Sequence, residues 1–129
     1  MAKDGDVLFA HNATVGPVAI LKTSFEFVIL STTATYYRCN SNKLINTYLK
    51  NILASDYFKK QYTGIMSQST RNQVPITTQR KLKLVLPCLE EQTKIANFLS
   101  AVDQKIEVVV QQIEQAKTWK KSLLQQMFV

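Results

Sequence analysis

The sequence predicts an α+β protein, in which a small mixed-sheet domain with one or two short helices precedes a long C-terminal coiled-coil helix. Residues 1–88 mix short apolar runs with turn residues. Residues 89–129 contain neither Gly nor Pro and keep a helical spacing of apolar residues. The chain has 129 residues, which suits one ordinary domain with a long appendage. We therefore expect two domains, 1–88 and 89–129.

Five segments of the first domain have the composition of strands. Residues 6–10 form an apolar run after a turn at Gly5. β-Branched and aromatic residues gather in 18–21, 25–30 and 35–39, and a last apolar run covers 82–86. Gly16 and Pro17 punctuate residues 11–17, which we expect to form a loop.

One or two helices follow these strands. Apolar residues spaced at i, i+4 and i+8 predict an amphipathic helix over residues 42–54; they are Leu44, Ile45, Tyr48, Leu49, Ile52 and Leu53. Ser55 is placed to cap a second short helix that runs to residue 62. Residues 67–73 are polar throughout and predict a loop.

The C-terminal helix has the clearest pattern in the sequence. Steps of four and three residues give a seven-residue repeat in which only Lys120 is charged; it comprises Ile95, Leu99, Val102, Ile106, Val109, Ile113, Ala116, Lys120, Leu123 and Met127. A helix over residues 90–128 would be ~58 Å long, which exceeds the span of a compact domain of this size. We expect this apolar stripe to contact a partner helix, with Trp119 beside it as an anchor or as a cover for its own helix.

Charges at the two ends of this helix differ in sign. Glu90 and Glu91 stand at its start, and Lys117, Lys120 and Lys121 stand near its end. This placement complements the helix dipole. It also suits an antiparallel pair of identical helices, since each acidic start would face a basic end. We expect a homodimer through these helices; the alternative is that the charges serve the dipole alone.

Positive charge is concentrated in one stretch. The net charge is +7, but residues 38–83 hold nine basic residues against the single acid Asp56, and the rest of the chain sums to −1. Such a local excess is typical of surfaces that bind a polyanion such as nucleic acid. The alternative is a basic face that only keeps the protein soluble.

Few residues are suited to catalysis. His11 is the only histidine, and the sequence has no Cys-x-x-Cys pair, phosphate-binding loop or dinucleotide-binding turn. We expect no metal site and no catalytic residues. The polar start, the absence of a long apolar run and the two cysteines, Cys39 and Cys88, indicate a cytoplasmic protein without a membrane span.

Four blocks of residues, in this order, resemble the specificity subunit of type I restriction–modification enzymes. The first is Gly5 to Ala10 with Thr14-Val15-Gly16, and the second is Ser69-Thr70-Arg71 before a segment ending Leu86-Pro87. The third runs from Pro87 to Ala96 and continues with Phe98-Leu99 and with residues 103–106. The fourth covers residues 120–128.

The resemblance implies a non-catalytic subunit that reads one half of a bipartite site in double-stranded DNA. It implies that residues 1–88 are part of a target-recognition domain and that the long helix is a spacer that docks methyltransferase subunits. Methylation and cleavage, with S-adenosylmethionine, ATP and Mg, would belong to the methyltransferase and restriction subunits of a bacterial or archaeal complex. A full subunit has two recognition domains and two long helices, whereas this chain has one of each. The recognition domain of the family normally begins well before a segment like residues 5–8, so we expect this chain to lack the front of its domain.

Candidate DNA-binding residues fall into two groups. Base-reading candidates have side chains able to form paired hydrogen bonds and lie in two predicted loops; they are Ser69, Thr70, Arg71, Asn72 and Gln73, and His11, Asn12 and Thr14. Phosphate-binding candidates are Arg38, Lys43, Lys50, Lys59 and Lys60. The alternatives are ordinary turn chemistry for the loops and a solvated face for the lysines. The chain as a whole has a second interpretation, a helical assembly module without DNA binding of its own.

Overall fold

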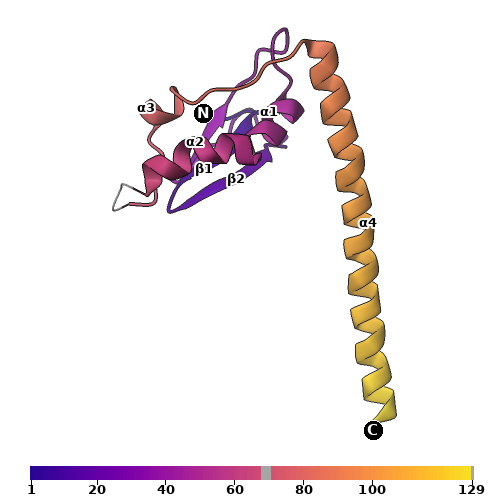
Figure 1. The fold of residues 1–129 in the computed structure, drawn as a ribbon. Helices are drawn as coiled ribbons and strands as arrows, with labels where there is room; N and C mark the ends of the chain where they lie inside the picture. The colour runs from indigo at the N-terminus through magenta and orange to yellow at the C-terminus, as the bar shows by residue number, and fades with distance from the viewer. Residues whose placement is uncertain (68–70, 129) are drawn as a thin grey trace. The chain divides into compact units, whose positions relative to one another are not determined.

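The computed structural model of the chain describes residues 1–67 and 71–128. These residues form two compact units, Met1–Ala96 and Asn97–Val129. The elements in chain order are β1 (Val7–Asn12), β2 (Thr14–Ile20), β3 (Ala34–Tyr37), α1 (Asn46–Leu53), α2 (Asp56–Met66), α3 (Ile76–Gln79) and α4 (Leu89–Met127) (Figure 1). The predicted α+β class, with a small sheet and a long C-terminal helix, is confirmed.

The sheet is antiparallel, with the strand order β2-β1-β3. Val7 of β1 pairs with Ile20 on one side and with Tyr37 on the other. The mixed sheet that we expected is therefore wrong in this detail. Ala13 alone connects β1 to β2, and so short a connection allows only antiparallel pairing, because parallel strands need a long crossover.

The loop that we expected over residues 11–17 is also wrong. Ala13 takes a left-handed conformation with φ 64°, so one residue reverses the chain and both strands continue up to it. The pairing shifts at a bulge between Phe9 and His11, opposite a segment in which Gly16 has φ 119°. Pro17 is tolerated within β2 because β2 lies at the edge of the sheet.

Two of the expected strands do not form. In segment 25–30 only Val28 pairs, through two backbone hydrogen bonds with Ala2 of 2.7 and 2.9 Å. Segment 82–86 forms no strand. Side chains form hydrogen bonds with its backbone, in place of the bonds that a neighbouring strand would make. The Gln61 amide binds both the N–H and the C=O of Lys83 at 2.8 Å, and the Tyr48 hydroxyl donates to the Val85 carbonyl at 2.6 Å.

The short helices agree with the sequence in part. Helix α1 begins at Asn46 instead of residue 42, because the preceding turn has its own hydrogen bonds: the N–H groups of Lys43 and Leu44 both donate to the Asn40 carbonyl at 2.9 Å. The predicted cap of α2 is confirmed, since the Ser55 hydroxyl accepts from the Phe58 N–H. The short helix α3 had no counterpart in our predictions.

Helices α1 and α2 cover one face of the sheet (Figure 1). The core joins alternate residues of β1 to the apolar faces of these helices; it comprises Val7, Phe9, Leu49, Leu53, Phe58, Tyr62 and Val74. The Phe9 ring meets the rings of Phe58 and Tyr62 edge to face, with centroids 6.1 and 6.0 Å apart. These contacts place β1, whose C-terminal end carries the candidate site, on a rigid base.

The first two turns of α4 belong to the first unit, where Gln92 fixes them. The Gln92 side chain is fully buried. Its amide nitrogen donates to the carbonyls of Lys43 (3.0 Å) and Pro87 (2.9 Å), and its oxygen accepts from the Ile45 N–H (3.0 Å). One side chain therefore joins the start of α4 to the turn before α1.

Candidate nucleic-acid interface

The two segments that hold the base-reading candidates, 11–14 and 71–74, lie side by side, although about sixty residues of sequence separate them. We call these two segments the paired loops. Asn12 forms an isolated antiparallel bridge with Gln73. The N–H of Ala13 donates to the Asn72 carbonyl, and the Asn72 side-chain amide donates to the Ala13 carbonyl, each at 2.9 Å. Two segments that the sequence offered as separate candidates therefore form a single surface.

This paired surface rests on buried residues. The Val74 N–H donates to the His11 carbonyl at 2.8 Å, and the side chains of both residues are buried. His11 is only 8% exposed, and the Nδ1 of its imidazole has no hydrogen-bond partner among the described residues. The structure thus places this ring in the interior, beneath the loop surface instead of on it.

Four candidate side chains remain at the paired loops. Thr14, Arg71 and Asn72 are exposed, while Asn12 and Gln73 are partly buried. One N–H of the Asn72 amide donates within the protein, so we set Asn72 apart from the other four candidates at these loops, Asn12, Thr14, Arg71 and Gln73. Guanidinium, amide and hydroxyl groups are the ones that read base edges in the major groove. Ser69 and Thr70, the remaining two candidates, lie outside the described residues.

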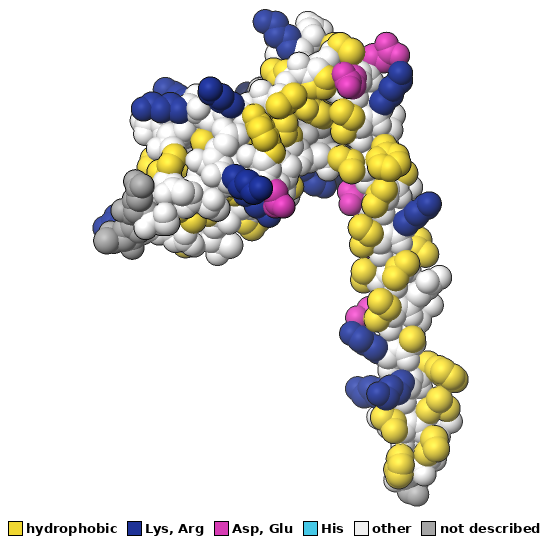
Figure 2. All heavy atoms as spheres, viewed as in Figure 1, with side chains coloured by type: hydrophobic (Ala, Val, Ile, Leu, Met, Phe, Trp, Pro, Cys, Tyr) yellow, Lys and Arg dark blue, Asp and Glu magenta, His cyan; other side chains and the backbone are white. Residues whose placement is uncertain are grey.

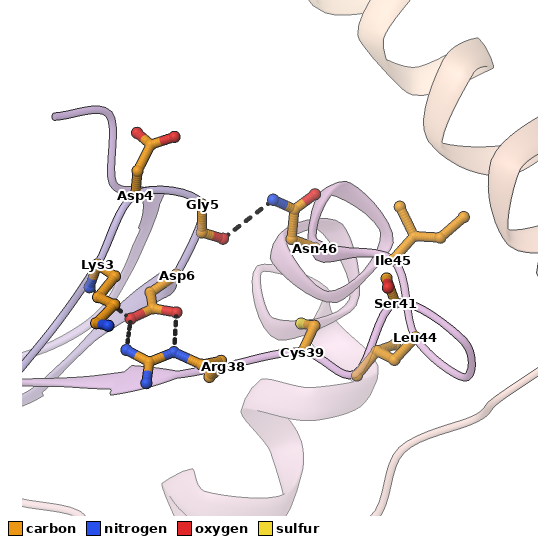
Figure 3. A pocket seen from close by; sticks show the side chains of 10 residues that line it. All are labelled: Lys3, Asp4, Gly5, Asp6, Arg38, Cys39, Ser41, Leu44, Ile45 and Asn46. Atoms are coloured by element: carbon orange, nitrogen blue, oxygen red, sulfur yellow. Dashed lines mark hydrogen bonds and ion pairs between the residues drawn. The ribbon is translucent and has the colours of Figure 1, made fainter. Parts of the chain in front are cut away.

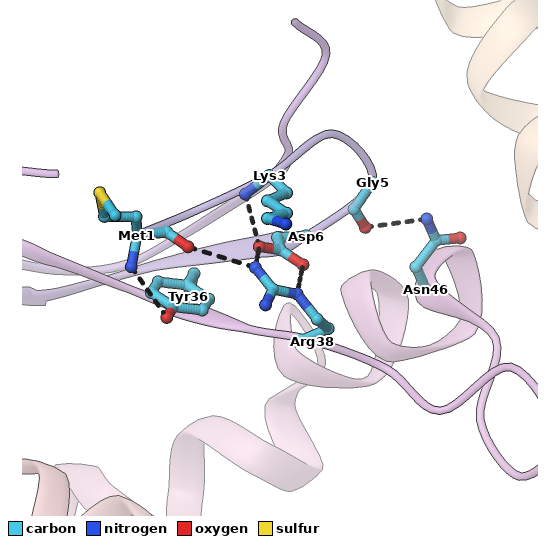
Figure 4. A network of polar contacts seen from close by, with 7 residues as sticks. All are labelled: Met1, Lys3, Gly5, Asp6, Tyr36, Arg38 and Asn46. Carbon is cyan, nitrogen blue, oxygen red and sulfur yellow. Dashed lines mark hydrogen bonds and ion pairs between the residues drawn. The ribbon is translucent and has the colours of Figure 1, made fainter. Parts of the chain in front are cut away.

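Arg38 is engaged elsewhere. Its guanidinium forms a bidentate pair of hydrogen bonds with the Asp6 carboxylate, from Nε to Oδ1 at 3.0 Å and from Nη2 to Oδ2 at 2.7 Å, as Figure 4 shows. Nη2 also donates to the Met1 carbonyl, and the guanidinium lies 5.3 Å from the centre of the Tyr36 ring. The hydrogen bonds from Arg38 hold the pKa of Asp6 below its usual value, and the same pair raises the pKa of Arg38. This geometry assigns Arg38 to the support of the sheet, so we leave it out of the phosphate-binding set.

A hollow of about 460 Å³ lies next to this pair (Figure 3). The Asp4 side chain points away from Asp6, and its Oδ1 accepts a hydrogen bond from the Thr23 N–H. Asn46 donates to the Gly5 carbonyl across the hollow at 3.0 Å. Burial, with the nearby Asp6 charge, raises the pKa of the Cys39 thiol, so the thiol is not an activated nucleophile. We interpret the hollow as the space left where the start of β1 meets the segment before α1, and not as a ligand site.

No cluster of three or more His, Cys, Asp or Glu side chains capable of holding a metal ion occurs within residues 1–67 and 71–128. Across the same residues, none of the helices has the length and apolar character needed to cross a bilayer.

The four candidate lysines occupy three elements of the first unit. Lys43 lies in the turn before α1, Lys50 lies on α1, and Lys59 and Lys60 lie on α2. None of the ion pairs found among the described residues includes them. The Lys and Arg side chains of this unit stand apart on the face shown in Figure 2, with few acidic side chains between them. Lysine side chains on such a face can contact phosphates.

The second unit consists of the rest of α4. Its apolar stripe is open, with Ile106 55%, Val109 51% and Ile113 48% exposed, and Figure 2 shows hydrophobic side chains along the helix. The other predicted contact residues are exposed or partly buried; they are Ile95, Leu99, Val102, Trp119, Leu123 and Met127. A stripe of this kind is suited to packing against a second apolar surface, since exposed apolar area is unfavourable in water.

Sequence reasoning missed two features of α4. Gln92 was treated as part of a motif only, and its burial could not be read from local spacing. Val108 was also missed, although it lies about three helical turns from Trp119 and therefore on the same flank of the stripe. Both Val108 and Trp119 have side chains that are at least half exposed. A helical wheel of α4 would have shown that Val108 and Trp119 share this flank.

The profile of the type I restriction modification DNA specificity domain matches residues 2–118 of the chain. The chain belongs to this family. The resemblance inferred from the four sequence blocks is thereby confirmed, as is the assignment of the chain as part of a specificity domain.

Two curated relatives from Methanocaldococcus jannaschii give the same result. The MjaX type I restriction enzyme specificity subunit is 34% identical over an alignment of 131 positions, which covers 96% of this chain. The MjaVIII type I restriction enzyme specificity subunit is 29% identical over 126 residues, which cover 95% of this chain. In both cases the match spans 30% of the relative's length.

Proposed function

We propose that this specificity-family chain reads one half of a bipartite sequence in double-stranded DNA and docks methyltransferase subunits. The observation that carries the proposal is the pairing of segment 11–14 with segment 71–74, which gathers guanidinium, amide and hydroxyl side chains on one surface. Recognition of a short DNA sequence needs several such groups at fixed spacing. The family membership of the chain supports DNA as the ligand.

Base reading falls to the paired loops. Arg71 has the donors to bind guanine through two hydrogen bonds, and Asn12 and Gln73 have the donor and acceptor that adenine requires. Thr14 can donate, accept or contact a thymine methyl group. These side chains would enter a groove together, because the backbones that carry them are hydrogen-bonded to each other.

Phosphate contacts fall to the lysines. Lys43, Lys50, Lys59 and Lys60 belong to a stretch with a net charge of +8. Each lysine that neutralises a phosphate releases condensed counterions, which adds affinity without adding sequence preference.

Catalysis would reside in partner subunits. Methylation and cleavage, with S-adenosylmethionine, ATP and Mg, would be carried out by the methyltransferase and restriction subunits, and this chain would bring them to the DNA. The proposal draws on the resemblance to type I specificity subunits, and the names of the curated relatives are consistent with it.

The stripe of α4 would pair with the same stripe of a second copy. In an antiparallel pair, the acidic start of one helix faces the basic end of the other, so Glu90 and Glu91 approach Lys117 and Lys121. Leu99, Ile106 and Ile113 would be buried between the helices. A dimer of this kind would carry two recognition domains and read a symmetrical, split DNA site.

One flank of the stripe is suited to the methyltransferase subunits. Val108 and Trp119 are 52% and 67% exposed on this flank, and the positions between them on the same side are Gln112 and Gln115. The opposite flank carries Asp103, Glu114 and Lys121. A partner that buries a helix flank favours an uncharged surface with a large aromatic anchor.

A second candidate function is a helical assembly module that does not bind DNA by itself. The exposed apolar stripe of the second unit favours it, since such a stripe can pair with another helix without DNA. The two functions respond differently to salt. DNA binding weakens steeply as salt rises, whereas an apolar helical contact hardly changes.

The test is selection from a randomised duplex DNA library by the chain in complex with its methyltransferase subunit. We expect an enriched half-site sequence for the native chain and an altered preference at one base pair for Arg71→Ala. An electrophoretic shift assay on the enriched duplex then gives the affinities. A native complex that enriches no sequence would overturn half-site reading, and an unchanged preference in Arg71→Ala would remove Arg71 from the reading set.

A further inference from the structure

We propose that Asn72 is a positioning residue, which holds the β1–β2 turn against segment 71–74 so that both carry their side chains to DNA as one surface. The inference rests on the proposed function. It gives Asn72 a role different from that of its neighbours Arg71 and Gln73, which would contact bases directly.

The turn at Ala13 depends on groups outside the hairpin. Among the described residues Ala13 is the only one other than Gly with a positive φ, a conformation that a Cβ disfavours. Both of its backbone polar groups turn to Asn72: the N–H donates to the Asn72 carbonyl and the C=O accepts from the Asn72 amide nitrogen. One residue therefore satisfies both polar groups at the tip of the hairpin.

The Asn72 contacts also align the neighbouring residues. Next to the Ala13–Asn72 contact Asn12 bridges to Gln73, and one residue further along the His11 carbonyl receives the Val74 N–H. The buried side chains of His11 and Val74 fix this second contact to the core. The hairpin tip is the exposed end of the arrangement, and there the Asn72 side chain supplies a hydrogen bond that the two backbones do not.

The chemistry of Asn72 distinguishes positioning from reading. Adenine recognition by asparagine uses the amide nitrogen and the amide oxygen together. In this structure one of the two N–H groups of that nitrogen donates to Ala13, and this bond fixes the orientation of the amide at the turn. The side chain is thereby placed to hold the turn, and to act on DNA through Asn12 and Thr14, which flank Ala13 on either side.

A double-mutant cycle tests this role, with the chain in complex with its methyltransferase subunit and duplexes enriched from the randomised library. The variants are Asn72→Ala, the pair Asn12→Ala with Thr14→Ala, and the triple variant. We expect Asn72→Ala to reduce the preference for the enriched site by about tenfold, a typical size for one good base contact. We expect the triple variant to match the Asn12→Ala, Thr14→Ala pair, because a positioning residue has no effect once the side chains it positions are gone.

Hydrogen exchange of the same variants without DNA gives an independent measurement. In Asn72→Ala the Ala13 amide should exchange faster, while amides of the core strand β1 such as Phe9 should keep their native rates. Gln73→Ala is the matched control, since it truncates the adjacent side chain and should leave the exchange of Ala13 unchanged.

Each contrary result has a distinct meaning. An added loss in the triple variant as large as that of Asn72→Ala alone would show that Asn72 contacts DNA itself, and would overturn the inference. So would an unchanged preference in Asn72→Ala or a native exchange rate at Ala13. If the native complex enriches no sequence at all, the proposed function fails and the inference fails with it.

Discussion

The Arg38 guanidinium donates two hydrogen bonds to the Asp6 carboxylate and thereby ties the residue before β1 to the residue after β3. The Asp6 side chain is only 4% exposed, whereas half of the Arg38 side chain reaches solvent. The Lys3 N–H adds a third hydrogen bond to Asp6 at 2.7 Å. The pair closes the end of the sheet opposite to the paired loops.

This pair predicts a specific dependence of stability on pH. Because its hydrogen bonds lower the pKa of Asp6 in the folded state, the ionised carboxylate stabilises the fold above the ordinary pKa of 3.8. That contribution disappears as the pH falls below 3.8 toward the folded-state value. Urea unfolding should show Asp6→Asn less stable than the native chain at pH 7, with a smaller difference at pH 3. Asp4→Asn is the control, and an equal difference at both pH values would contradict the prediction.

Gln92→Leu should destabilise the first unit by about 3 kcal/mol, because it removes the three hydrogen bonds that the buried Gln92 side chain makes with the Ile45 N–H and two carbonyls. The free energy of unfolding from urea titration measures the effect. The matched control is Gln104→Leu on the exposed part of α4, where a surface substitution should change the stability by less than about 0.5 kcal/mol. Similar values for the two variants would show that the Gln92 hydrogen bonds contribute little.

The helix pair predicts a change of mass in solution. Native chain should scatter light as a dimer, and the double variant Ile106→Asp, Ile113→Asp should scatter as a monomer, because each substitution would bury a carboxylate in the apolar seam. The control adds the same charges on the opposite side of the helix, as Gln104→Asp with Gln111→Asp, and should remain a dimer. A native chain that is already monomeric at high concentration would rule out self-pairing.

Phosphate binding should be visible in the salt dependence of DNA affinity. Replacing Lys59 and Lys60 by Ala should reduce the slope of log affinity against log salt by about 1.8, or about 0.9 for each phosphate that a lysine no longer neutralises. The sequence preference should stay unchanged, since lysines that bind phosphates do not read bases. Lys22→Ala, outside the basic stretch, should leave the slope at its native value. A native slope in the Lys59, Lys60 variant would place the DNA away from α2.

Local patterns in the sequence were sufficient for the long helix, the α+β class and the family. The seven-residue repeat predicted residues 90–128, and α4 covers Leu89–Met127. Ser55 predicted the start of α2 for a similar reason, since a helix cap involves residues only three positions apart. Such features depend on neighbours in the chain, so composition and spacing reveal them.

Tertiary structure alone decided which distant residues meet. Segment 82–86 has the composition of a strand, but Gln61 and Tyr48 bind its backbone in place of a neighbouring strand. The two segments were each predicted as loops, yet nothing in their composition indicated that Asn72 would bind Ala13. Hydrogen bonds between remote segments depend on how the intervening helices pack against the sheet, and the periodicity of a single element carries no information about that packing.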